Sequence, residues 1–207
     1  TTPKSKSHKK SKHHHHKDKH RKPPTKKQNQ PDTKSKIDTF PFNPSDSFNG
    51  IFKYLTIKTG GNIHENGTIE IASNSVFSKG SHGPQTLVQE SNQYAASRGD
   101  RDAWVSFDFK KFRVEISGYS VKAGTSCSMK NWVLEISDDG QNWTVIDEHV
   151  NSKDLEKPSV KRSYKVDSNR FVRFCRIRHN GDFVAYGSDK AMQVSQIEFF
   201  GRIKSPL

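Results

Sequence analysis

Histidines and paired carboxylates are the side chains in this sequence best suited to hold a metal or catalyse a reaction. Four consecutive histidines, His13–His16, offer imidazole nitrogens of the kind that bind divalent metals. Lysines surround this run and repel cations, so we interpret it as part of a solvated basic segment. The histidines beyond residue 40 lack the regular spacing of a zinc site, and we predict no metal ligands among them: His64, His82, His149 and His179.

The adjacent carboxylates Asp138 and Asp139 precede Gly140, an order that is typical of a tight turn rather than of an active site. No Ser/His/Asp triad, Cys/His pair or Gly-rich phosphate-binding loop appears at a recognisable spacing. We therefore predict that the protein is not an enzyme and requires no cofactor.

Residues 1–39 differ in composition from the rest of the chain. They contain 13 Lys or Arg against three Asp, so they carry about +10 of the +13 net charge. Ile37 is their one large apolar side chain, and a segment that buries so little surface is predicted to be disordered. Without aromatic residues to stack on bases, we expect only weak, nonspecific contact with polyanions. Residues 40–207 have the length of one domain with a hydrophobic core.

The domain is predicted to consist mainly of short strands. The segment Trp132–Trp143 alternates apolar and polar residues, turns at Asp138-Asp139-Gly140 and predicts a hairpin that ends near residue 147. Six further runs have the composition of strands: Ile69–Ile71, Trp104–Phe109, Phe112–Val121, Ser163–Val166, Phe171–Ile177 and Met192–Phe200. Strands without alternating helices predict an all-β, antiparallel β-sandwich.

Two local features interrupt this pattern. The apolar spacing of Phe48–Leu55 predicts a short N-terminal helix, capped at Ser45–Ser47 and ended by Gly60-Gly61. In the last strand, the apolar positions change register between Val194 and Ile197. This change predicts a β-bulge near Ser195-Gln196.

The two cysteines, Cys127 and Cys175, are too few for a disulfide framework. Cys175 occupies a strand position where an apolar residue would face the core, so we predict a buried free thiol, which favours a reducing compartment. The sequence contains no apolar run of membrane-spanning length and no visible signal peptide. We therefore expect an intracellular protein, located in the cytoplasm or the nucleus.

Three charged residues lie within predicted strands. Glu198 stands between Ile197 and Phe199, while Arg173 and Arg176 lie in the neighbouring strand. We hypothesise that Glu198 forms an ion pair with one of these arginines, because a buried carboxylate needs a compensating partner.

Four motifs occur in the order seen in discoidin domains: W-V-S-F-D-F from Trp104, W-V-L-E-I-S-D-D-G-Q-N-W from Trp132, R-F-C-R-I-R from Arg173 and I-E-F-F-G from Ile197. Over roughly residues 48–201 the chain resembles this family, also called coagulation factor five/eight type C. The resemblance implies a galactose-binding-like, jelly-roll-like β-sandwich in which Trp104, Trp132 and Trp143 are structural. Residues 48–55 and 60–67 are similar to the intracellular members that accompany BTB domains.

Discoidin domains usually bind their ligands with loops at one end of the sandwich. By strand order, those loops correspond here to residues 74–84, 91–103 and 122–130. The resemblance therefore implies seven candidate ligand-binding residues: Phe77, His82, Tyr94, Arg98, Arg101, Ser126 and Met129. Exposed aromatic residues beside arginines suit either a sugar or a protein surface.

A non-catalytic recognition module is the predicted function, and its ligand class stays open between two readings. In many extracellular members of the discoidin family a cysteine pair ties the two ends of the domain together, and this chain lacks that pair. Its absence and the basic tail favour intracellular protein–protein interaction, as the binding end of a larger adaptor. The fold also supports a carbohydrate-binding, lectin-like domain. Membrane insertion through loop tips ranks last, because Phe77 and Met129 are the only apolar candidates for such tips.

Overall fold

The structure, a computed structural model, describes residues 35–74, 83–91, 93–96, 102–125, 127–181, 183–185 and 192–206. The predicted disorder of residues 1–34 therefore concerns a segment outside the described residues. Within the described part of the chain, no helix combines the length and apolar character required to cross a membrane.

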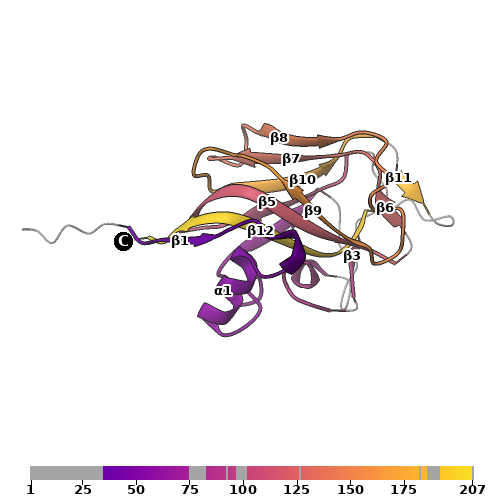
Figure 1. Ribbon diagram of the computed structural model, residues 1–207. Helices are drawn as coiled ribbons and strands as arrows, with labels where there is room; N and C mark the ends of the chain where they lie inside the picture. The colour runs from indigo at the N-terminus through magenta and orange to yellow at the C-terminus, as the bar shows by residue number, and fades with distance from the viewer. Residues whose placement is uncertain are drawn as a thin grey trace, which may run out of the picture. The chain divides into compact units, whose positions relative to one another are not determined.

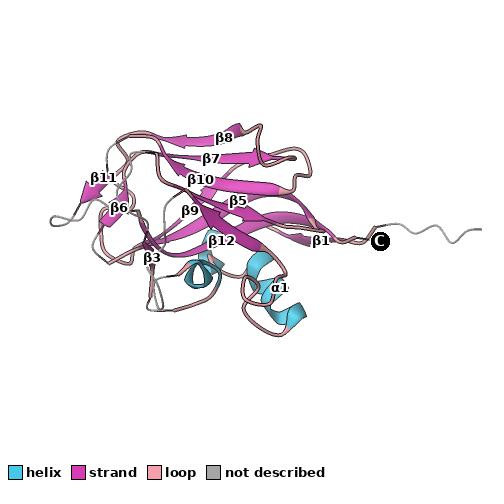
Figure 2. Ribbon diagram, turned by 180° about the vertical axis from the view of Figure 1, so that it is seen from behind, coloured by secondary structure: helices cyan, strands magenta, loops and turns pink. Residues whose placement is uncertain are grey.

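Two antiparallel sheets form a β-sandwich, which confirms the predicted fold class (Figures 1 and 2). The first sheet has the order β1-β12-β5-β9, and β3 also pairs with β12. Its strands are β1 (Ile37–Phe40), β3 (Ala95–Ala96), β5 (Arg113–Ala123), β9 (Lys161–Lys165) and β12 (Gln193–Lys204). The second sheet has the order β2-β4-β10-β7-β8. Its strands are β2 (Glu70–Ser73), β4 (Trp104–Asp108), β7 (Trp132–Ser137), β8 (Thr144–His149) and β10 (Phe174–His179).

Smaller elements complete the domain. A two-stranded sheet joins β6 (Cys127–Met129) to β11 (Phe183–Ala185). The helical elements are the 3-10 turn η1 (Pro44–Asp46), the α-helix α1 (Ile51–Thr59) and the 3-10 helix η3 (Pro84–Val88).

The alternation in the sequence sets which face of each strand is buried. In β4, Val105 and Phe107 are fully buried between the sheets, whereas Trp104, Ser106 and Asp108 lie on the half-buried outer face. The predicted β-bulge is confirmed, because the pairing of β12 with β5 shifts register between Val194 and Gln196.

The turn between β7 and β8 also follows the prediction. Gly140 has a φ of 74°, which favours glycine. The Asp139 carboxylate accepts hydrogen bonds from the backbone N–H groups of Gln141 and Asn142, both at 2.8 Å. The pair Asp138-Asp139 therefore belongs to a turn, where Asp139 is fully occupied in holding the backbone.

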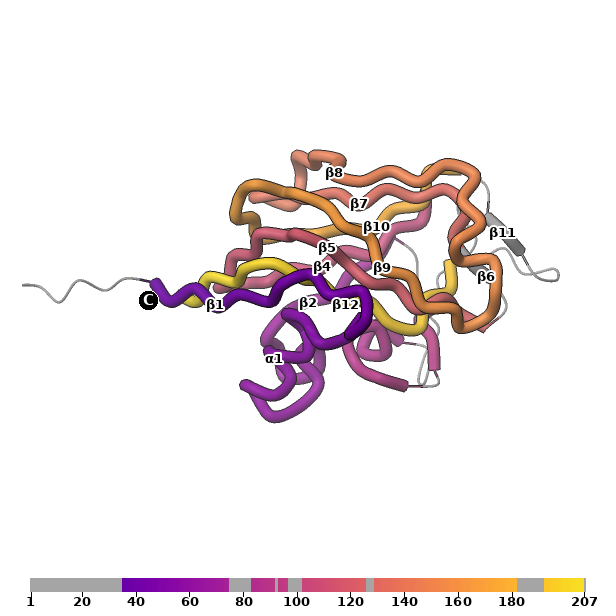
Figure 3. Tube along the Cα trace, in the orientation of Figure 1, coloured from indigo at the N-terminus to yellow at the C-terminus, as the bar shows by residue number. Residues whose placement is uncertain are grey.

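The folded part begins earlier than we predicted. Residues 37–39, which we assigned to the disordered tail, lie in β1 and pair with the C-terminal half of β12 (Figure 3). Asp38 is tied further to α1, because the Tyr54 hydroxyl donates a 2.6 Å hydrogen bond to its carboxylate. A strand of four residues with one large aliphatic side chain has too weak a pattern to be recognised beside a lysine-rich segment.

The helix α1 contributes directly to the core. It buries Ile51, Phe52 and Leu55, as the apolar spacing predicted, and it ends before Gly60. The ring of Phe52 lies 5.3 Å from those of Phe107 in β4 and Phe199 in β12, measured between ring centres. Aromatic contacts of this kind join the helix to both sheets.

A buried carboxylate positions the start of α1. Glu198 is 2% exposed, and it accepts hydrogen bonds from the backbone N–H groups of Phe52 at 2.7 Å and Lys53 at 3.0 Å. It also accepts one from the N–H of Phe199 at 2.9 Å. Gly50 permits this close approach, because a Cβ at that position would lie 2.3 Å from the carbonyl oxygen of Phe199. A strand residue therefore caps the helix, in place of the cap that we predicted at residues 45–47.

The hypothesis of an ion pair between Glu198 and an arginine is therefore wrong. Arg173 instead pairs with Asp108 through two hydrogen bonds of 2.7 and 2.8 Å, and Arg176 pairs with Glu135 at 2.7 Å. Burial raises the pKa of Glu198 to about 7, although the backbone N–H donors oppose this shift.

Replacing Glu198 tests the capping interaction. In Glu198→Gln, one acceptor oxygen becomes an NH₂ group that faces a backbone N–H, and we expect a loss of about 1–3 kcal/mol in the free energy of unfolding. Urea denaturation measures this difference, and Glu65→Gln, at an exposed position, is the matched control. Equal denaturation midpoints for wild type and Glu198→Gln would show that the cap contributes nothing.

Candidate functional site

The predicted binding loops belong to one end of the sandwich, which we call the loop end. Antiparallel pairing sets Trp132 opposite both His149 and His179, and Trp104 opposite Arg178. Consequently β4 and β7 begin at the loop end, while β8 and β10 finish there. The short strands β3, β6 and β11 lie at the same end (Figures 1 and 2).

Most of the predicted ligand-binding residues cannot be placed at this end. Five of them lie outside the described residues: Phe77, His82, Arg98, Arg101 and Ser126. Tyr94 is described and half-buried, directly before β3, which pairs with the start of β12. Its role in binding stays a prediction.

Met129 is not the exposed apolar tip that we expected. It lies in β6 and is 1% exposed, within the hydrophobic core. The pairing of β6 with β11 explains the difference, because the predicted loop 122–130 contains a strand that turns one face inward. Met129 therefore does not contribute a surface for a ligand.

Asn131 joins three of the connections at the loop end, a role that the sequence did not reveal. Its side-chain oxygen accepts a 2.7 Å hydrogen bond from the backbone N–H of Asn151. Its backbone carbonyl accepts a 3.1 Å hydrogen bond from the backbone N–H of Asn180. The Asn180 side chain in turn donates to Glu148 at 3.1 Å. These bonds hold three segments in fixed positions relative to one another: the residue before β7, the residues after β8 and the residue after β10. Together these bonds, of which the Asn131–Asn151 bond is part-buried, give the loop end a rigid frame.

A buried polar network lies beneath this frame. The indole nitrogen of Trp132 donates to the Tyr119 hydroxyl at 3.0 Å, and that hydroxyl donates to Asp147 at 2.8 Å. His149 bonds to the same carboxylate at 2.9 Å and stacks on Trp132. Burial raises the pKa of Tyr119 well above its usual value. Tyr119 is fully buried, whereas Asp147 and His149 are partly exposed, and their bonds join β5 to β8 within the scaffold.

The outer face of the second sheet is also occupied by internal contacts. The Arg176 guanidinium lies 4.0 Å from the ring centre of Trp143 and 5.7 Å from that of Trp104, while it pairs with Glu135. Trp132 belongs to the core, and Trp104 and Trp143 are half-buried. The structural roles predicted for the tryptophans agree with these contacts, and the arginines stabilise the sheet face.

Metal and thiol chemistry have no support among the described residues. They contain no group of three or more His, Cys, Asp or Glu side chains placed to hold a metal ion. Cys175 is a free, fully buried thiol, as predicted, and burial raises its pKa far above the usual range. A thiol that stays protonated and inaccessible is not a nucleophile.

The comparison with known families decides the identity of the domain. The model of the F5/8 type C domain family matches residues 70–186. The chain belongs to the F5/8 type C family. Domains of this family are binding modules, and the described residues contain no catalytic arrangement that departs from that role.

Solved structures share the fold at low sequence identity. The Clostridium perfringens module CpGH89CBM32-5, in complex with GalNAc-β-1,3-galactose, has a TM-score of 0.53 and 13% identity, covering 65% of this chain and 96% of its own. Chitosan-binding module 2 from a Paenibacillus sp. IK-5 chitosanase/glucanase, in complex with chitotriose, has a TM-score of 0.53 and 14% identity. It covers 65% of this chain and 97% of its own. At this identity, the similarity establishes the F5/8 type C fold alone.

One curated relative is a much longer protein. The E3 ubiquitin-protein ligase Ufd4 of Drosophila melanogaster is 25% identical over 114 residues, which is 52% of this chain and 4% of the relative. The match therefore concerns a small segment of that ligase.

The pH dependence of stability tests the buried histidine at the loop end. Burial lowers the pKa of His179 from 6.5 to about 3, so between those values the unfolded chain binds more protons than the folded one. Above pH 6.5 the imidazole is neutral in both states, and the stability that depends on its neutral form is fully present. As the pH falls towards 3, the imidazole takes up a proton in the unfolded chain only, and the free energy of unfolding decreases. We expect the free energy of unfolding to fall more steeply from pH 7 to pH 4 in wild type than in His179→Asn.

The control for this experiment is His20→Asn in the basic tail, which should retain the slope of wild type. Urea denaturation at a series of pH values gives all three curves. Parallel curves for wild type and His179→Asn would contradict the assignment of a buried, neutral imidazole.

Proposed function

We propose that this F5/8 type C domain is a non-catalytic recognition module that binds a protein partner through its loop end. The observation that carries the proposal is the frame around Asn131, which fixes the start of β7, where the candidate loop 122–130 ends. A rigid scaffold that presents variable loops is the usual architecture of a recognition site. The candidate contacts are Tyr94, directly before β3, and the predicted loop residues Phe77, His82, Arg98, Arg101 and Ser126.

Three observations support an intracellular protein partner over an extracellular role. The segments 48–55 and 60–67 resemble the F5/8 type C domains that accompany BTB domains. The partial match to Ufd4 associates a similar segment with a ubiquitin ligase. The free thiol of Cys175 is compatible with a reducing compartment. We propose accordingly that the domain is the partner-binding end of a cytoplasmic or nuclear adaptor.

Carbohydrate binding is the second candidate function. It is supported by the similar folds of modules that were solved with GalNAc-β-1,3-galactose and chitotriose bound. In this alternative, the same loop end binds a glycan, with Tyr94 as an aromatic contact.

Substitution at the loop end separates the two functions. Proximity labelling in cells with the 207-residue chain should identify protein partners whose labelling falls roughly tenfold in Tyr94→Ala and Arg98→Ala, the loss expected for a good interface contact. The control is Ile57→Ala, because Ile57 is 71% exposed on α1. Thermal denaturation confirms that each variant remains folded.

A glycan array with the same proteins provides the opposing outcome. Reproducible saccharide binding that is lost in Tyr94→Ala would replace the protein-interaction function by carbohydrate recognition. Partners that label equally in wild type and both loop variants would contradict a binding site at the loop end.

A further inference from the structure

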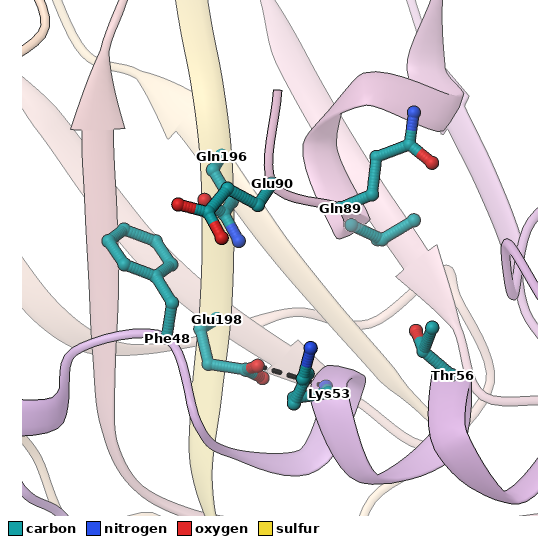
Figure 4. Close-up of a pocket in the computed structure, with 8 residues that line it drawn as sticks. Phe48, Lys53, Thr56, Gln89, Glu90, Gln196 and Glu198 are labelled. Carbon is teal, nitrogen blue, oxygen red and sulfur yellow. Dashed lines mark hydrogen bonds between the residues drawn. The ribbon is translucent and has the colours of Figure 1, made fainter. Parts of the chain in front are cut away.

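A polar groove lies beside α1, away from the loop-end contacts described above. Two adjoining hollows of about 260 and 510 Å³ share four lining residues: Phe48, Lys53, Glu90 and Gln196. We call this surface the α1 groove. Its walls come from the start of α1 and the residue following η3, and its floor is β12 (Figure 4). One end reaches Thr56, and the other reaches η1 and Lys161.

The floor of the groove contains a buried amide without a partner. Gln196 is 7% exposed, and its side chain makes no hydrogen bond with any described residue. It directly follows the bulge of β12 at Ser195, and bulges commonly re-aim a side chain at a binding site. Because the amide lines the groove and makes no internal hydrogen bond, its donor and its acceptor are both available to a ligand.

Two opposite charges in the groove are also unpaired. Lys53 and Glu90 are both exposed, and neither forms an ion pair within the described part of the chain. Both line the same hollow as Gln196, and Lys53 lies next to Glu198 in the close-up view (Figure 4). An ammonium donor, a carboxylate acceptor and an amide that is both donor and acceptor are thus available within one hollow.

Among the other described residues that line the groove, the buried polar atoms are engaged within the fold, with one exception. Glu198 lines the floor, but its oxygens accept the backbone bonds that cap α1. Lys161 lies 5.4 Å from the ring centre of Phe48, and Asp46 accepts a 2.8 Å bond from Asn49. The exception is the hydroxyl of Thr56, which is buried without a hydrogen-bond partner among the described residues.

The free groups specify the chemistry of a ligand. A side-chain amide matches one peptide unit, because its N–H and C=O groups pair with the C=O and N–H groups of the backbone. Unpaired Lys53 and Glu90 are best matched by a ligand that carries a negative and a positive charge. A neutral saccharide could hydrogen-bond to both groups through its hydroxyls but offers no opposite charge, whereas a peptide with both charges forms charge-assisted bonds, which are roughly twice as strong.

We propose that the α1 groove binds a short peptide segment of a protein partner, in which one backbone amide meets Gln196 between an acidic and a basic side chain. The acidic side chain pairs with Lys53 and the basic one with Glu90. Phe48 supplies an apolar wall for the residue between them. The inference rests on the proposed protein-interaction function. It gives the domain a second contact surface besides the loop end, and it specifies that this surface binds a peptide with one acidic and one basic side chain.

Nuclear magnetic resonance of the ¹⁵N-labelled 207-residue chain tests the proposal at a single side chain. The Gln196 amide gives its own pair of side-chain signals, which are assigned by their absence in Gln196→Met. The probes are acetyl-Glu-Ala-Lys-amide and its reverse, acetyl-Lys-Ala-Glu-amide, with acetyl-Gln-Ala-Gln-amide as the uncharged control. Galactose and chitotriose are the saccharide probes.

We expect a saturable shift of the Gln196 signals with at least one charged peptide. Its affinity should fall roughly tenfold in Lys53→Gln and in Glu90→Gln, which each remove a charge-assisted hydrogen bond. The matched controls Lys157→Gln and Glu65→Gln, at exposed positions outside the groove, should bind as wild type does. Gln196→Met should unfold at the same temperature as wild type or higher, because an amide without a partner does not stabilise the fold.

Three results would overturn the proposal. The first is a shift of the Gln196 signals with saccharides only. The second is a clear loss of thermal stability in Gln196→Met, which would assign the amide to the fold. The third is peptide-induced shifts confined to Tyr94 and Asn131, which would reject the groove and leave the proposed function of the loop end intact. Failure of the loop-end proposal would appear separately, in the labelling experiment with Tyr94→Ala.

Discussion

The bond between the Glu198 carboxylate and the first turn of α1 holds the rest of the arrangement in place. It joins the last strand of the chain to its first helix, across 146 positions of sequence. The backbone N–H groups of a first helical turn have no partner within the helix, and Glu198 satisfies those of Phe52 and Lys53 inside the core. This placement brings Phe52 against both sheets and sets one wall of the α1 groove. The fold and the groove therefore depend on the same contact.

The sequence predicted those features that arise from local periodicity. Alternation located the strands of the sandwich, and the change of register beyond Val194 located the bulge. Periodicity does not show which distant group binds a buried carboxylate. We therefore predicted an ion pair between Glu198 and an arginine, whereas backbone N–H groups of α1 bind this carboxylate. The same limit applies to Met129, whose apparent loop contains a strand, and to Gln196, whose unpaired amide becomes evident only when β12 and α1 are placed together.

The distribution of charge separates the scaffold from the candidate binding surfaces. Arg173 and Arg176 pair with acidic neighbours on the outer sheet face, and Asp147 is held by Tyr119 and His149. Such groups stabilise the sandwich and are not available to a ligand. The α1 groove differs, because Lys53 and Glu90 form no ion pair within the described residues and the unpaired amide of Gln196 lines the same hollow. Membership of the F5/8 type C family accounts for the sandwich, and the groove is lined by side chains of α1, β12 and the segments beside them.

Amide hydrogen exchange at Phe52 and Lys53 tests the role of Glu198 most directly. First-turn amides ordinarily exchange quickly, because no carbonyl of the helix protects them. If Glu198 caps α1 within the core, both amides should exchange as slowly as those of the central strands, and Glu198→Ala should abolish this protection. Rapid exchange at both positions in the wild-type protein would contradict the account.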